Sequence, residues 1–148
     1  MGICQRANTQ FDVNRRRFMM KKETIYGEVI AKANHYLAVP DSAGGKRIIK
    51  DDAIRSYETS FARQCVIYKD KFINAPFGLV IDVYYSSNRF DLDNSLKTIL
   101  DCLQMCRAIS NDNLCMKIEA TKHIDRNTPR VVFGIIEYEP NLFEYGNT

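Results

Sequence analysis

Three acidic residues and one lysine lie close together between residues 91 and 112. The run DLDN begins at Asp91 and includes Asp93, Lys97 follows shortly after it, and Asp112 precedes a further apolar segment. Carboxylates are the hard oxygen ligands that Mg2+ prefers, and Mg2+ held by a few carboxylates keeps waters that a phosphate oxygen can replace. The residue types therefore predict a magnesium site formed by Asp91, Asp93 and Asp112, with phosphodiester chemistry as its function.

The same residues also have an interpretation that needs no metal. Aspartate in front of a helix is an ordinary N-terminal cap, and Asp93, Lys97 and Asp101 have the spacing of an ordinary ladder of helical ion pairs. A cap needs one acid, however, and here two acids flank a leucine, while Asp112 lies in a second polar cluster. These two features favour the metal site, with caps and surface pairs as the alternative.

A calcium loop of the EF-hand type is excluded by the residues that follow. Asp91, Asp93 and Ser95 imitate the first three ligands of such a loop. Leu96 then stands where the sharp turn needs glycine, and Cys102 stands where the bidentate glutamate belongs.

The acids flank a segment with the period of an amphipathic helix. Its apolar side chains recur at helical spacing and face a core, whereas Asp93 and Lys97 lie on another side. Asp91 or Asp93 is then placed at the helix N-terminus, where free backbone N–H groups and the helix dipole favour an anion. The apolar positions are Leu92, Leu96, Ile99, Leu100 and Leu103.

The remaining segments predict an α+β fold. A helix beginning at residue 51 has a buried stripe at Ile54, Tyr57, Phe61 and Cys65. Alternating or apolar patterns predict the strands. The last two strands are expected to pair as a hairpin through the turn at 125–129. The predicted strands are 24–33, 77–85, 114–121 and 131–138, and residues 34–50 are expected to form a loop or hairpin.

This order of elements predicts a small mixed β-sheet packed with two main helices in a single domain. We expect the domain to span residues 23–140, with a flexible basic N-terminal arm at 1–22 and a tail at 141–148. A length of 148 residues with 45% hydrophobic content suits one core.

The predicted helix raises a geometric problem. A helix of 12 to 15 residues is about 20 Å long, so Asp112 at its far end is too distant to share an ion with Asp91 and Asp93. Either a return loop at 105–111 brings Asp112 alongside the helix start, or a second subunit completes the site. Both arrangements stay open at this point.

Composition predicts a soluble, cytoplasmic protein. The sequence contains no apolar run long enough to span a membrane and no secretion signal. Its five cysteines are odd in number and include no C-x-x-C motif, which is typical of reduced thiols rather than a disulfide framework or zinc site.

The distribution of basic residues is more informative than the net charge of +3. A nuclease must hold a polyanion against its own carboxylates, so cations are expected near the acids. His35 and His123 are alternative general bases, but a surface or DNA-contact role suits both better, because no second catalytic group is visibly paired with them. The DNA-binding candidates are Lys32, Asn34, Lys46, Arg47 and Arg89.

The motif as a whole resembles the RusA family of Holliday junction resolvases, small phage-derived endonucleases. The likeness rests on DLDN at 91–94, Lys97, Asp101, Leu103 and Asp112 before a strand, and it extends more loosely over residues 25–138. It implies that Asp91, Asp93 and Asp112 are metal-binding catalytic acids, that Lys97 is an essential lysine, and that the protein is a homodimer. The segment 32–35 reads KANH, where family members often carry a Pro, Ser, Lys, Asn stretch.

The resulting hypothesis is a Mg2+-dependent, structure-selective endodeoxyribonuclease that resolves four-way DNA junctions in recombination and repair. Its origin is expected to be bacterial or phage. In this hypothesis Mg2+ activates the attacking water, and Lys97 stabilises the transition state or orients the water. The rival functions are a non-catalytic module that binds branched DNA and a related nuclease that cuts flaps or duplex DNA.

Overall fold

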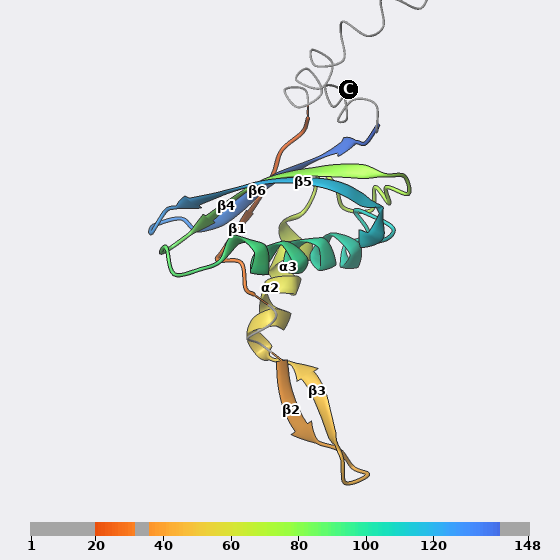
Figure 1. The fold of residues 1–148 in the computed structure, drawn as a ribbon, viewed down its shortest axis with the longest axis vertical. Helices are drawn as coiled ribbons and strands as arrows, with labels where there is room; N and C mark the ends of the chain where they lie inside the picture. The colour runs from red at the N-terminus through yellow and green to blue at the C-terminus, as the bar shows by residue number, and fades with distance from the viewer. Residues whose placement is uncertain (1–19, 32–35, 140–148) are drawn as a thin grey trace, which may run out of the picture.

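A computed structural model describes residues 20–31 and 36–139 of the chain and confirms the α+β fold. A mixed four-stranded sheet has the order β1-β6-β4-β5, and both helices cover one of its faces (Figure 1). Strand β6 runs antiparallel to β1 and β4, whereas β5 runs parallel to β4. The strands are β1 (Glu23–Tyr26), β4 (Phe77–Tyr85), β5 (Cys115–Ile124) and β6 (Arg130–Glu137).

The predicted C-terminal hairpin is wrong. β5 and β6 are not partners but lie on opposite sides of β4. The turn after β5 carries the chain past the end of β4, where the backbone N–H of Asp125 donates to the carbonyl of Tyr85 over 2.8 Å. Alternating side chains specify the two faces of a strand but not its neighbour, so the pattern could not exclude this topology.

The core lies between the sheet and the helices α2 (Asp52–Gln64) and α3 (Leu92–Met105). Alternate residues of β4 from Phe77 to Tyr85 point to the helix side and are all at most 1% exposed. Ile54, Tyr57 and Phe61 of α2 are also buried, which confirms the predicted stripe. The apolar face of α3 packs onto the same core, so its polar face is left toward solvent.

The first predicted strand is shorter than expected. It ends at Tyr26 because Gly27 adopts a φ of 111°, which an L side chain rarely adopts, and its N–H donates to the carbonyl of Pro129. The segment that follows leaves the sheet and runs toward α3, where the hydroxyl of Thr98 donates to the carbonyl of Ile30 over 2.6 Å. This segment therefore approaches the predicted site.

The expected hairpin is present as a separate two-stranded sheet. It consists of β2 (Tyr36–Pro40) and β3 (Lys46–Lys50), and its turn is closed by a hydrogen bond from the Asp41 N–H to the carbonyl of Gly45. The hairpin projects away from the main sheet beyond α2 (Figure 1). The described side chains of the hairpin are therefore exposed or half-buried and lie outside the core.

The chain reverses sharply after α3. Arg107 has a φ of 62°, and the N–H of Ala108 donates back to the carbonyl of Leu103 over 2.9 Å. A short 3-10 helix, η3 (Asp112–Leu114), then leads into β5. Within the described residues, no helix is long and apolar enough to cross a membrane.

Candidate active site

Asp91 occupies the N-cap position of α3, yet its side chain makes no capping hydrogen bond. Asp51 occupies the same position in α2, and its carboxylate accepts a hydrogen bond from the N–H of Ile54 over 3.0 Å. The side chain of Asp51 therefore caps α2, whereas the capping interpretation is wrong for Asp91. The exposed Asp91 carboxylate is left available to a ligand.

Tyr85 of β4 is hydrogen-bonded to the N-terminal end of α3. Its buried hydroxyl donates to the carbonyl of Asp91 over 3.2 Å and is also hydrogen-bonded to the hydroxyl of Ser95. Burial raises the pKa of Tyr85, and the negative charges of Asp91, Asp93 and Glu28 raise it further, against a lowering by Ser95. The carboxylates of Asp91, Asp93 and Glu28 are thus close enough to raise the pKa of the Tyr85 hydroxyl.

Lys97 binds two carboxylates on the exposed side of α3. Its ammonium lies 2.6 Å from an oxygen of Asp112 and 3.0 Å from an oxygen of Asp101. Hydrogen bonds to Asp112 and Asp101 raise the pKa of Lys97 to about 12, so it carries a fixed positive charge at neutral pH. Within the described residues no ion pair joins Lys97 to Asp93, so only the second half of the predicted ladder forms.

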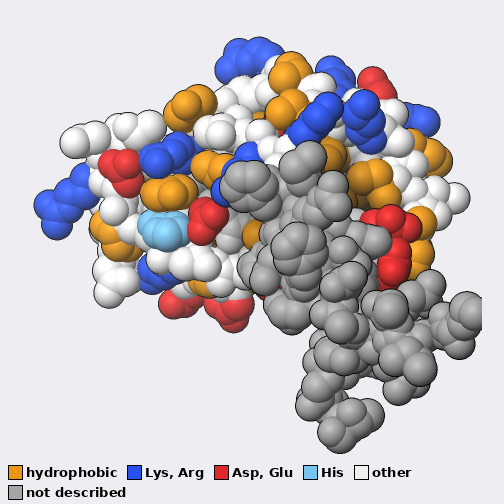
Figure 2. Space-filling view, turned by 90° about the horizontal axis from the view of Figure 1, so that it is seen from above, with side chains coloured by type: hydrophobic (Ala, Val, Ile, Leu, Met, Phe, Trp, Pro, Cys, Tyr) orange, Lys and Arg blue, Asp and Glu red, His pale blue; other side chains and the backbone are white. Residues whose placement is uncertain are grey.

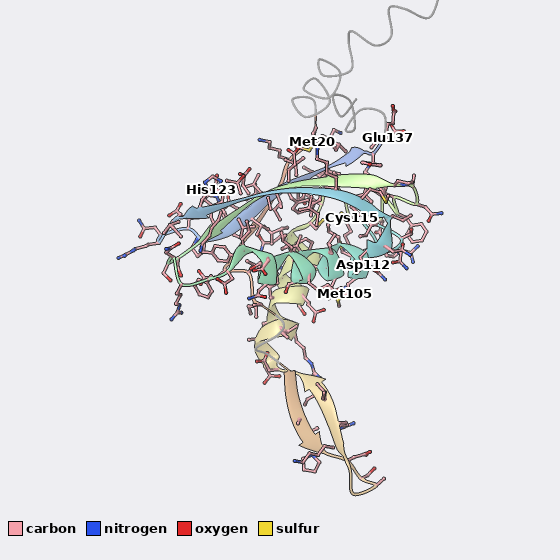
Figure 3. All side chains as sticks on the ribbon, viewed as in Figure 1. Met20, Met105, Asp112, Cys115, His123 and Glu137 are labelled. Carbon is pink, nitrogen blue, oxygen red and sulfur yellow. The ribbon has the colours of Figure 1, made fainter. Side chains whose placement is uncertain are left out.

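The reversal after α3 places Asp112 beside the helix. Figure 3 shows Asp112 near the C-terminal end of α3. Its backbone N–H donates to the side-chain oxygen of Gln104 over 3.1 Å, and its carboxylate accepts from the ammonium of Lys97. The chain therefore doubles back, but it does not bring Asp112 to the helix start as the return-loop prediction required. It brings Asp112 to the ammonium of Lys97, but not into a common cluster with Asp91 and Asp93.

The predicted site consequently has two parts in one chain. The acid pair, Asp91 and Asp93, lies at the N-terminus of α3, and the Lys97 cluster, with Asp101 and Asp112, begins one turn later, about 6 Å along the helix. Across residues 20–31 and 36–139, no three His, Cys, Asp or Glu side chains come close enough together to hold a metal ion.

Comparison with known families decides what kind of domain carries this arrangement. Residues 26–136 match the family described as Endodeoxyribonuclease RusA. The chain belongs to the RusA family. The match extends from the end of β1 almost to the end of β6, so it includes the acid pair and the Lys97 cluster. No curated protein matches the chain.

The described cationic candidates of this RusA domain are exposed. Arg89 lies two residues before Asp91, with its guanidinium 4.8 Å from the ring centre of Phe90. Lys46 and Arg47 are on the projecting hairpin. The other DNA-binding candidates, Lys32 and Asn34, lie outside the described residues, as does His35.

A cationic surface that the sequence analysis missed lies along α2. Arg55 and Arg63 are exposed and border an open hollow of about 410 Å³, together with the hydroxyl groups of Ser56, Thr59 and Ser60 and with Asp52. Helical spacing of exposed polar residues opposite the buried stripe was the available signal, but exposed arginines alone are too common to indicate a site.

His123 lies on the face of the RusA sheet that the helices leave open. Its imidazole contacts Asp82 at 2.8 Å and stacks on Tyr84 with ring centres 4.4 Å apart. Figure 2 looks onto this face, where side chains of both charges are interspersed. Asp82 thus has a hydrogen-bonded structural role, and His123 lies on the face of the sheet opposite the helices, whereas the acid pair lies on the helix side.

Proposed function

We propose that this RusA-family chain is a Mg2+-dependent endodeoxyribonuclease that resolves Holliday junctions in DNA recombination and repair. The observation that supports this most directly is the free Asp91 carboxylate at the N-terminus of α3, one position before a helix whose second residue is Asp93. An ordinary cap would use that carboxylate for the helix itself.

The donor set fits a hard divalent cation. Asp91 and Asp93 are exposed carboxylates beside free backbone N–H groups, so they would hold Mg2+ while leaving room for waters and a phosphate. When bound, Mg2+ supplies an activated water and neutralises charge on the phosphate. Asp112 is proposed as the third acid, and it would have to exchange its contact with Lys97 for one with the metal.

Lys97 supplies a positive charge next to the acid pair. Its raised pKa keeps the ammonium protonated throughout the neutral range, and the side chain is 61% exposed, so it is accessible to DNA. A phosphate placed at the acid pair lies within about one helical turn of this ammonium. We assign Lys97 to the negative charge that develops on the phosphate during hydrolysis.

The DNA is proposed to lie along the helix side of the molecule. Arg89, the hairpin residues Lys46 and Arg47, and the exposed Arg55 and Arg63 of α2 form separate positive positions on that side. The open sheet face carries both signs of charge and suits a polyanion less well (Figure 2). Lys32 and Asn34, which lie outside the described residues, stay DNA-binding candidates on the sequence alone.

A homodimer would supply the two cuts that a symmetric junction requires. β5 is an edge strand of the sheet, and Met116 and Ile118 on it are 56% and 38% exposed. An edge strand with exposed apolar side chains is a common pairing surface. Cys65, Cys102 and Cys106 are buried and form no disulfide, which suits a reducing, cytoplasmic setting.

One observation favours the non-catalytic rival. The ammonium of Lys97 forms ion pairs with Asp101 and Asp112, as ordinary surface charges in a binding module would. A module of this kind would bind four-way DNA in the absence of metal and never cut it. A single cleavage assay therefore distinguishes the two functions.

That assay compares labelled four-way, flap and duplex DNA with Mg2+ and with EDTA. We expect the four-way junction to be cut in Mg2+ only, and the variants Asp91→Asn and Asp93→Asn to lose cleavage while retaining binding. Asp51→Asn is the matched control, because asparagine also caps a helix and Asp51 is the N-cap of α2. Binding without cleavage by the wild type would support the rival, and preferred cutting of flaps or duplex would redefine the substrate.

A further inference from the structure

Two oppositely charged side chains hold the loop that leads into the acid pair. This β4–α3 loop consists of residues 86–91. The N–H of Ser86, at its start, donates to the carboxylate of Glu28 over 2.8 Å. The ammonium of Lys122 donates to the carbonyl of Asn88 over 3.2 Å and to the carbonyl of Phe90. Each end of the loop is thus bonded to a charged group.

The two charged groups come from different parts of the fold. Glu28 belongs to the segment after β1, which Thr98 of α3 holds through the carbonyl of Ile30. Lys122 belongs to β5, is paired in register with Val83, and has its ammonium 5.7 Å from the ring centre of Tyr85. The loop is therefore held between the N-terminal segment and the edge strand.

Glu28 and Lys122 form hydrogen bonds with main-chain atoms of the loop and do not pair with each other. Among the described residues neither Glu28 nor Lys122 forms a salt bridge, although Lys117 on the same strand pairs with Glu119 at 3.3 Å. Hydrogen bonds from an ammonium, or to a carboxylate, are roughly twice as strong as neutral ones. The β4–α3 loop is thus held at both ends by hydrogen bonds of the stronger, charge-assisted type.

Further contacts tie the end of the loop to the buried Tyr85. The ring of Phe90 stacks on the ring of Tyr85 with centres 5.4 Å apart, and the Tyr85 hydroxyl donates to the carbonyl of Asp91. The carbonyls of residues 88, 90 and 91 are all fixed as a result. Rotation of the peptide between Phe90 and Asp91 would turn the Asp91 side chain, and Lys122 opposes this rotation.

We propose that Glu28 and Lys122 are positioning residues that hold the β4–α3 loop and thereby orient the Asp91 carboxylate for metal binding. The orientation of Asp91 rests on the proposed function, whereas the holding of the loop does not. Partners outside the ligand shell typically change metal affinity or activity by about 10- to 100-fold when they are lost.

The test uses full-length protein and four variants. Lys122→Met keeps the aliphatic stem and removes the ammonium, Lys122→Arg restores a cationic donor, and Glu28→Gln keeps an acceptor oxygen without the charge. Lys117→Met is the matched control, because Lys117 lies on β5 but bonds to Glu119 instead of the loop. Hydrogen exchange at residues 86–91 is measured without metal or DNA. Mg2+ affinity is measured by calorimetry without DNA, and junction affinity is measured in EDTA.

We expect faster exchange in the loop and an Mg2+ affinity about tenfold weaker for Lys122→Met and Glu28→Gln, with junction affinity unchanged. Lys122→Arg should recover most of both properties, and Lys117→Met should match the wild type. The proposal is overturned if exchange and Mg2+ affinity are unchanged in both Lys122→Met and Glu28→Gln, or if Lys117→Met changes them equally. If the wild type neither binds Mg2+ nor cuts DNA, the proposed function is what fails, and the exchange data alone then decide whether these residues hold the loop.

Discussion

The ammonium of Lys97 and the carboxylate of Asp112 are 2.6 Å apart, although the turn after α3 separates them in sequence. This contact joins the exposed face of α3 to the start of η3. In a Mg2+-bound enzyme Asp112 would be expected to leave Lys97, which would free the ammonium for the phosphate. The ion pair therefore connects the third proposed metal ligand to the proposed electrostatic catalyst.

Removing Lys97 should affect the rate far more than it affects binding. Lys97→Ala is expected to lower the single-turnover cleavage rate by about 10² to 10³, because the ammonium acts on charge that develops in the transition state. An exposed ion pair contributes only about 0.2 to 1 kcal/mol to stability, so the variant should remain folded. Rates at saturating enzyme, compared with junction affinity at two salt concentrations, measure this. An unchanged rate with weaker binding would make Lys97 a DNA contact.

The raised pKa of Lys97 predicts no loss of its charge over the working range of pH. A folded-state pKa of about 12, above the usual 10.5, means that the stabilising contribution is fully present below pH 10.5 and is lost as the pH rises toward 12. The cleavage rate should therefore show no step from Lys97 between about pH 7 and 9.5. A step in that range that disappears in Lys97→Arg would contradict the assignment.

The two N-cap aspartates should differ in their effect on stability. Asp51→Ala removes a hydrogen bond to the Ile54 N–H and should lower the free energy of unfolding by about 0.5 to 2 kcal/mol. Asp91→Ala removes no capping bond and should change it much less. Urea unfolding followed by circular dichroism compares the two variants directly. Equal losses would show that Asp91 does cap α3 in solution.

Replacing Mg2+ with Ca2+ should separate binding from cutting. Ca2+ accepts the same oxygen ligands with longer distances and looser geometry, so it should support junction binding and align the attacking water poorly. Gel shift and cleavage assays on one preparation test both properties. Strong cleavage in Ca2+ alone, or cleavage that EDTA leaves unchanged, would contradict the metal assignment.

The arginines of α2 should contribute to affinity without contributing to chemistry. Arg55→Ala and Arg63→Ala are expected to weaken junction binding to a similar extent for all sequences, and to reduce the salt dependence of binding by about one counterion each. The single-turnover rate at saturating enzyme should stay at the wild-type value. Lys69→Ala, on an exposed turn outside this surface, serves as the control.

Periodicity alone predicted the elements that hold the site. The strand from Phe77 to Tyr85 was assigned with its observed ends, and α3 was placed correctly, because both have a strong apolar pattern and face one core. The partner of β5 could not be predicted, since a strand's alternation is the same beside any neighbour.

Local pattern also could not reveal the contacts made by side chains from distant segments. The acid pair was recognised because only Leu92 separates Asp91 from Asp93 in sequence, whereas the contact of Asp112 with Lys97 depends on the left-handed turn at Arg107. The role of Lys122 depends on which edge of β4 its strand occupies. Both contacts depend on the tertiary structure, so the spacing of residues in the sequence could not predict them.

The position of β4 between two long neighbours has a consequence for how the site would be lost. Both edges of β4 are hydrogen-bonded, to β5 and to β6, and Tyr85 at its end is fully buried under the start of α3. Segments of this kind usually open only when the whole domain unfolds. The Asp91 carboxylate is thus attached to the most cooperative part of the fold, so denaturant should abolish its ligand affinity and the tertiary structure in a single transition.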